Sequence, residues 1–282
     1  MGAVIGAVMF YFQGCPVWDV TKVTVAALLL ATFVNALLIP ATPGTEIRGL
    51  GEMYPLNGPS WSLFFEYIGN ILYALIIRKF STKALAVLVV AAGCGLAAFS
   101  IFGPYGDICA GFSLTGTEFT GGFFRLLYAF SAGLLLSRVF RPVGIRGAFW
   151  KCSLLVIFLL AVPRLGGADR LWMNGLYDTV CFALFFPLIV YWGASGKITD
   201  RYTNRVCKFL GDISYPLYMV HYPFIYLYYG WVKNEELTFG ESLPGALAVV
   251  VGSILLAYIC LKLYDEPVRR YLANRFLKSK KR

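Results

Sequence analysis

The sequence predicts an all-α protein, a polytopic transmembrane bundle of eight or nine helices. Of its 282 residues, 59% are apolar and only 14% are charged, and the mean hydropathy is +0.68. Soluble domains carry about 25% charged residues, and here the apolar residues form long blocks. Inside a bilayer the backbone must satisfy its own hydrogen bonds, so we expect each block to be a helix.

Nine apolar blocks mark the expected helices. They are 1–12, 22–40, 60–78, 84–102, 121–138, 149–162, 171–192, 210–230 and 244–263. The first and sixth are shorter than the roughly 20 residues that a span needs. The first resembles the second half of a helix. We expect one membrane domain over residues 1–272, followed by a basic tail over 273–282.

Charge in the loops gives the expected topology. Four basic segments hold 18 of the 25 Lys and Arg residues, and the four segments between them hold only four. The basic set comprises 78–83, 138–151, 193–208 and 264–282. By the positive-inside rule these segments and the C-terminus are cytoplasmic, which predicts a multi-pass protein of the cell membrane. The net charge of +10 therefore indicates a lipid bilayer as the partner of the basic segments, and not nucleic acid.

The seven cysteines contain no C-x-x-C pair, and most lie within or beside apolar blocks. This pattern favours small core residues over a metal site or a disulfide framework. We expect neither a metal nor a bound cofactor.

Ionisable side chains inside spans are costly and are candidates for function. Four stand out, namely Glu66, Arg125, Asp178 and His221. His221 is the only histidine, so any proton transfer by histidine must use it, although a hydrogen-bonded core role is the more common one for such a residue. Glu66 follows Asn57 and Trp61 in a helix-starting stretch. It either forms a structural pair or orients a substrate.

Two of these residues have competing interpretations. Arg125 lies near the non-cytoplasmic end of its span, where a snorkelling side chain is the favoured interpretation. Asp178 lies about two turns into its span and either pairs with a basic side chain or binds a hydroxyl. The Gly2–Gly6 stretch matches G-x-x-x-G, which in an apolar helix indicates close packing.

These stretches resemble the membrane acyltransferase-3 family, whose members O-acylate sugars and other cell-surface molecules. Four blocks carry the resemblance: Asn57-x-Pro59-x-Trp61-Ser62-Leu63-x-x-Glu66; Arg125 with Phe130-x-x-Gly133-Leu134-Leu135; Leu210-Gly211-x-Ile213-Ser214-Tyr215-Pro216-Leu217-Tyr218-x-x-His221-x-Pro223; and Tyr264-Asp265-Glu266-Pro267-x-Arg269. The resemblance covers about residues 20–272, and the first and third blocks are its most specific parts.

The resemblance implies transfer of an acyl group, usually acetyl, from cytoplasmic acyl-CoA to a hydroxyl of a cell-surface carbohydrate or lipid-linked sugar. Acyl-CoA is then a co-substrate. A base activates the hydroxyl, and buried donors stabilise the oxyanion. His221 and Glu66 are the catalytic candidates. The substrate-binding candidates are Asn57, Trp61, Tyr218, Asp178 and Arg125.

The sequence departs from the family most clearly at the family's first helix. The family's first helix carries an Arg followed about ten residues later by a His, and no His precedes His221 here. We therefore expect this chain alone to show little transferase activity. A truncated, non-catalytic remnant is the first alternative function. A membrane transporter is the second, although no inverted repeat supports it.

Overall fold

The computed structural model describes residues 1–198 and 200–277, which form two compact units. The first unit comprises Met1–Trp61 and residues 208–277, and the second comprises Ser62–Cys207. The chain is nearly all helical, as predicted. In the described residues, the regular exception is a parallel pair of two-residue strands, β1 (Ile145–Arg146) and β2 (Gly196–Lys197).

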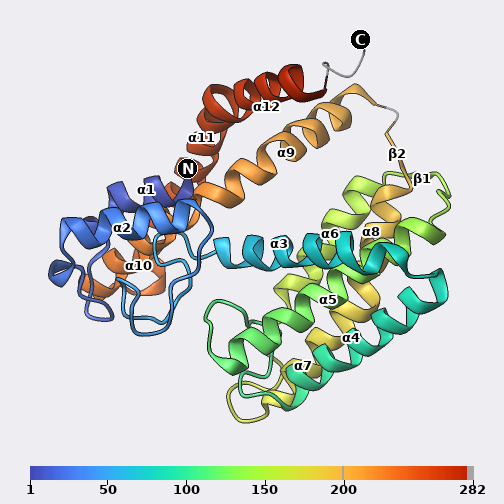
Figure 1. Ribbon diagram of the computed structural model, residues 1–282, viewed down its shortest axis with the longest axis horizontal. Helices are drawn as coiled ribbons and strands as arrows, with labels where there is room; N and C mark the ends of the chain where they lie inside the picture. Colours follow the sequence, from blue (N-terminus) through green and yellow to red (C-terminus); the bar gives the residue numbers. More distant parts are fainter. Residues whose placement is uncertain (199, 278–282) are drawn as a thin grey trace. The chain divides into compact units, whose positions relative to one another are not determined.

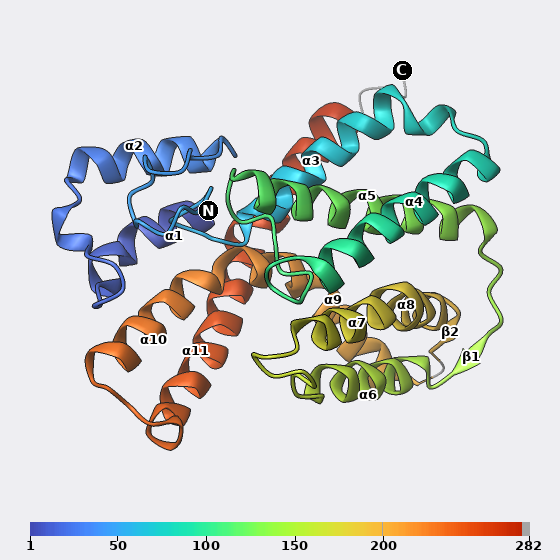
Figure 2. The same ribbon diagram turned by 90° about the horizontal axis from the view of Figure 1, so that it is seen from below.

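The first unit is built from both ends of the described chain. Its helices are α1 (Gly2–Met9), α2 (Val25–Ala36), α10 (Tyr222–Asn234), α11 (Phe239–Cys260) and α12 (Glu266–Leu272), together with most of α9 (Arg201–Val220). Two 3₁₀ turns, Phe10–Gln13 and Val20–Lys22, follow α1, and π-helical turns Leu261–Asp265 and Ala273–Leu277 flank α12. Helices α10 and α11 pack side by side (Figure 2).

A core of apolar side chains joins the two ends of the chain in this unit. Its buried members are Ala3, Phe10, Trp18, Val20, Leu28, Leu56 and Tyr226. The G-x-x-x-G stretch contributes by its lack of side chains: a Cβ on Gly6 would lie 2.0 Å from the carbonyl oxygen of Leu56. The close packing that this motif predicted is therefore confirmed.

The second unit contains most of α3 (Ser60–Leu75) and then α4 (Thr82–Phe102), α5 (Gly116–Val139), α6 (Ala148–Ala161), α7 (Leu171–Val180) and α8 (Phe186–Ala194). A 3₁₀ turn, Ile77–Lys79, links α3 to α4, and a π-helical turn, Cys181–Phe185, joins α7 to α8. Helix α4 packs along α5 and α7 (Figure 1). Ser100 on α4 donates to the carbonyl of Gly175 on α7 at 3.0 Å.

Local signals explain where several helices begin. Ser81 caps α4 by accepting from the backbone amide of Ala84, and Thr24 caps α2 in the same way through Ala27. Thr238 and Glu241 form a capping box at the start of α11. Each cap satisfies an amide that has no partner within the helix.

The predicted span list is confirmed in part. Four helical segments of the described chain are long and apolar enough to cross a membrane: Thr82–Phe102, Gly116–Val139, Leu171–Ala194 and Phe239–Phe276. Shorter apolar helices cover Gly2–Gln13, Val25–Ala36 and Ala148–Ala161. The count of eight or nine transmembrane helices is not confirmed. Of the expected tail, residues 278–282 lie outside the described residues.

The prediction of one continuous helix over 210–230 is wrong. Helix α9 ends at Val220 and α10 begins at Tyr222, with a bend at His221. Proline explains the break, because Pro216 and Pro223 lack the amide that would bond to the carbonyl four residues earlier. Pro223 thereby deprives Met219 of the helical partner of its carbonyl.

Candidate functional site

His221 lies at the bend between α9 and α10, in the first unit. Its Nδ1 is 3.0 Å from the carbonyl oxygens of both Leu217 and Tyr218. A carbonyl oxygen only accepts hydrogen bonds, so Nδ1 carries the proton in the neutral ring. Nε2 then holds the lone pair, and it makes no hydrogen bond to the described residues. This tautomer is the one that a general base needs at Nε2.

The bend is held by the Asn57–Pro59 segment. The Asn57 side-chain amide donates to the carbonyl of Met219 at 3.2 Å, which is the carbonyl that Pro223 leaves without its helical partner. The hydroxyl of Tyr218 donates to the carbonyl of Pro59 at 2.7 Å. Asn57 is only 1% exposed. The structure therefore brings three predicted site residues, Asn57, Tyr218 and His221, to one bend.

A second side-chain amide reaches the other side of the bend. Gln13, fully buried, donates through Nε2 to the carbonyl of Pro223 at 2.9 Å. Its Oε1 accepts from Nη2 of Arg48 at 2.9 Å. Arg48 also donates through Nε to the carbonyl of Pro55 at 3.0 Å. A chain of hydrogen bonds thus leads from Arg48 to the first turn of α10.

The Arg48 guanidinium lies among aromatic rings. Its central carbon is 3.7 Å from the centroid of the Tyr226 ring, and the rings of Phe10 and Trp18 lie at 5.2 and 5.3 Å. The Tyr226 hydroxyl donates to Glu52 at 2.5 Å. Burial raises the pKa of Glu52 above its ordinary value, while the Tyr226 hydroxyl and the charge of Arg48 oppose that rise.

Sequence reasoning missed Gln13, Arg48 and Glu52. One signal was present, because Arg48 is the single basic residue in the 40–59 segment. Neither its partners nor its burial follows from that signal, since residues 40–59 have no helical periodicity to indicate which side chains point inward.

Glu66 and Trp61 both lie in α3, and they belong to different units. Glu66 is exposed on the surface of the second unit. The reason is the helical phase: Phe65 is 2% exposed and packs its ring 5.5 Å from that of Phe119, while Glu66 lies a 100° step further round the helix. Its catalytic role stays a prediction. Trp61 is half-buried at the start of the helix.

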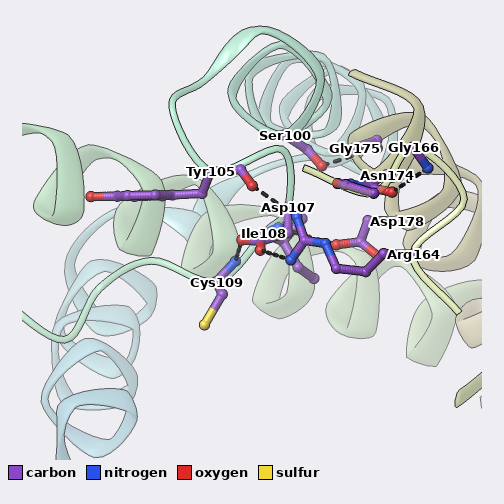
Figure 3. A network of polar contacts seen from close by, with 11 residues as sticks. Ser100, Tyr105, Asp107, Ile108, Cys109, Arg164, Gly166, Asn174, Gly175 and Asp178 are labelled. Carbon is purple, nitrogen blue, oxygen red and sulfur yellow. Dashed lines mark hydrogen bonds and ion pairs between the residues drawn. The ribbon is translucent and has the colours of Figure 1, made fainter. Parts of the chain in front are cut away.

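The second unit contains a separate pocket of about 350 Å³, lined by both apolar and charged side chains. Both Asp178 and Arg125, predicted from sequence, contribute to its walls, together with Asp107, Cys109 and Arg164. Asp178 accepts from the backbone amide of Ile108 at 3.2 Å (Figure 3). Arg125 donates to the carbonyl of Ala110 at 3.1 Å, so it binds backbone and does not only snorkel.

Two further side chains hold the rim of this pocket (Figure 3). Arg164 donates through Nη1 to the Asp107 carboxylate and through Nη2 to the carbonyl of Tyr105, each at 3.0 Å. Asn174 accepts from the Gly166 amide at 2.8 Å and donates to the Gly167 carbonyl at 2.9 Å. Because these contacts fix the loops on either side, Asp178 and Arg125 present a carboxylate and a guanidinium in a shaped cavity. Such groups bind hydroxyls and other polar substrate atoms.

The four described segments that are long and apolar enough to cross a membrane indicate a membrane protein. The chain belongs to the acyltransferase-3 family, because a family model described as an acyltransferase domain matches residues 2–262. This match confirms the resemblance carried by the blocks at 57–66 and 210–223. No curated protein and no solved structure shows a significant match.

Proposed function

We propose that this protein is a membrane O-acyltransferase that moves an acyl group, acetyl in the simplest case, from acyl-CoA to a hydroxyl of a cell-surface carbohydrate or lipid-linked sugar. Membership in the acyltransferase-3 family supports the reaction class. The observation that carries the proposal is the pair of 3.0 Å contacts from Nδ1 of His221 to the carbonyl oxygens of Leu217 and Tyr218, which place the proton on Nδ1 and leave Nε2 as a base at the bend. The proposal thereby gives His221 the role of the N-terminal His that the family resemblance implies, and it replaces the expectation of little activity.

In the proposed reaction, Nε2 of His221 removes the proton of the acceptor hydroxyl while the hydroxyl oxygen attacks the carbonyl carbon of the acyl-CoA thioester. The carbon–sulfur bond then breaks, and the imidazolium returns the proton to the departing CoA sulfur. The products are an ester and CoA thiol, so no redox partner is needed. Leu217 and Tyr218 would stabilise the transient imidazolium, because their carbonyls already accept from Nδ1.

The pocket of the second unit supports a separate part of the proposal, namely binding of a hydroxylated substrate. Asp178 offers carboxylate acceptors and Arg125 offers guanidinium donors in its walls. A sugar presents hydroxyls that both donate and accept, so this mixed lining suits it better than a purely cationic or anionic one would.

Acyl transfer can be measured in membranes from cells that express the protein from its native coding region. Radiolabelled acetyl-CoA is supplied, and label that mild alkali releases from the carbohydrate fraction reports ester formation. We expect His221→Gln to lower this label by about 10²–10⁴-fold, the usual contribution of a general base. The control is Lys233→Ala, a change at an exposed residue of α10, the helix that follows the bend. Label that stays within about twofold of wild type in His221→Gln would refute the proposed base.

A further inference from the structure

The histidine bend has an unusual feature: the backbone carbonyls two residues before and two residues after His221 are both bound by buried side-chain amides. Asn57 binds the carbonyl of Met219, and Gln13 binds that of Pro223. The two amides come from parts of the chain that are far from residue 221 in sequence. Their exposed fractions are 1% and 0%.

Burial makes these contacts consequential. A buried carbonyl without a partner costs about 1–3 kcal/mol, so the bend is favoured where a donor meets the Met219 carbonyl. Met219 needs such a donor because Pro223 has no amide to supply it. Pro223 accepts from Gln13 at the first turn of α10, which fixes the position of that turn.

The orientation of Gln13 is itself determined. Arg48 has only donors, so the atom of Gln13 that meets Nη2 must be the oxygen, and the nitrogen must point to Pro223. Arg48 is in turn held by the Pro55 carbonyl and by the Tyr226 ring. If the Gln13 amide were flipped, its nitrogen would face the Arg48 donor and its oxygen would face the Pro223 carbonyl oxygen.

We propose that Asn57 and Gln13 are positioning residues for His221. By holding the peptide groups on both sides of the histidine, they keep Nδ1 on the carbonyls of Leu217 and Tyr218 and so direct the lone pair of Nε2. Arg48 acts one step further out, by fixing Gln13. This inference rests on the proposed role of His221 as the base. It assigns Asn57 to the backbone of the bend, whereas the sequence predicted that Asn57 contacts substrate.

Because His221 is the only histidine, the inference can be tested on a single residue. Ring-¹⁵N-labelled histidine in the purified, reconstituted protein gives one pair of nitrogen signals, which report the tautomer directly. The test variants are Gln13→Glu and Asn57→Asp. Each keeps the side-chain shape and replaces the donating nitrogen with an oxygen. Asn234→Asp is the matched control, since its amide also donates to a carbonyl, that of Gly14 at 2.8 Å, at the other end of α10.

We expect the wild type and Asn234→Asp to show a protonated Nδ1. Gln13→Glu and Asn57→Asp should shift the signals toward a mixture of tautomers. The turnover number for acyl transfer should fall about 10- to 100-fold with little change in KM, as expected for misplacement without loss of a substrate contact. Unchanged ring signals in both variants would overturn the inference. Unchanged ring signals with a raised KM in Asn57→Asp would instead assign Asn57 to the substrate.

A rescue experiment covers the case in which these variants fold poorly. Pro223→Ala supplies a backbone amide that can bind the Met219 carbonyl, so Asn57→Ala should perturb the ring less in the Pro223→Ala background than alone. Equal perturbation in both backgrounds would contradict the inference. The ring signal needs no turnover, so a tautomer shift together with full activity of His221→Gln would refute the proposed base and leave the positioning intact.

Discussion

The guanidinium carbon of Arg48 lies 3.7 Å from the centroid of the Tyr226 ring, although the two residues are 178 positions apart in sequence. Each is only 4% exposed. A buried charge must find compensation, and here it comes from the ring face and from hydrogen bonds to Pro55 and Gln13. The pair therefore joins the loop before α3 to the helix that starts at the histidine bend.

Replacing Arg48 with Ala should destabilise the protein markedly. The change leaves the buried acceptors of Pro55 and Gln13 without donors, at about 1–3 kcal/mol each. Arg48→Lys should be intermediate, because it keeps the charge but loses the planar fork. Thermal unfolding in detergent measures both. The control is Lys22→Ala, whose side chain is 84% exposed in its ion pair with Asp19 and should change little. Equal melting temperatures for Arg48→Ala and Lys22→Ala would contradict the assigned role.

Glu52 should make stability depend on pH in the direction opposite to that of most carboxylates. Burial raises its folded-state pKa above the ordinary 4.5, so the native state holds the proton more tightly than the unfolded chain does. Its contribution is therefore fully present below the unfolded pKa and is lost as pH rises through the folded pKa. The difference in melting temperature between wild type and Glu52→Gln should decline as pH rises from about 4.5. Glu235→Gln controls for loss of one exposed carboxylate. A difference that grows with pH would refute this assignment.

Much of the helical framework was predictable, because long apolar runs and capping residues act locally. The predicted spans at 84–102, 121–138 and 171–192 correspond to described helices that begin and end within a few residues of them. The break at His221 was harder to predict. Pro223 indicated a disturbance, but the donor that meets the open carbonyl of Met219 is Asn57, which is distant in sequence and could not be identified from local pattern.

The site was predictable only where residue type alone carried the signal. His221 stood out as the single histidine, and Asp178 and Arg125 stood out as charges within apolar runs. Glu66 stood out for the same reason, yet it lies outside the packed face of α3, because only the neighbours of a helix decide which side is covered. Cysteines show the same limit: Cys181 and Cys260 are buried as predicted, whereas Cys94 and Cys109 are exposed.

Two glycines should respond to alanine in opposite directions. A Cβ on Gly6 would lie 2.0 Å from the Leu56 carbonyl oxygen, so Gly6→Ala forces α1 away from that backbone and should cost about 1–3 kcal/mol. A Cβ on Gly211 meets nothing within 4 Å, so Gly211→Ala in α9 should stabilise by roughly 0.5–1 kcal/mol through backbone entropy. Melting temperatures of the two variants against wild type test the pair. Stabilisation by Gly6→Ala would show that α1 does not approach residue 56 this closely.

Accessibility of Cys109 should test the predicted topology. It lies in the loop between α4 and α5, expected outside the cell, and it is exposed. With the other six cysteines replaced, a membrane-impermeant maleimide should label Cys109 in intact cells. The residue is exposed, but its thiol lines the pocket of the second unit, where partial desolvation and the charge of Asp107 raise the thiol pKa. The reaction should therefore be slow at neutral pH and accelerate up to about tenfold per pH unit.

Two sites in a cysteine-free background complete this experiment. Gly116→Cys, at the exposed start of α5, should label faster than Cys109 in intact cells, because a Cβ there meets nothing within 4 Å. Lys79→Cys lies in the basic segment between α3 and α4 and should react only after the membrane is permeabilised. Labelling of Lys79→Cys in intact cells would overturn the orientation. Labelling of Cys109 only after permeabilisation would do the same, and either result would place the basic segments on the outer side of the membrane.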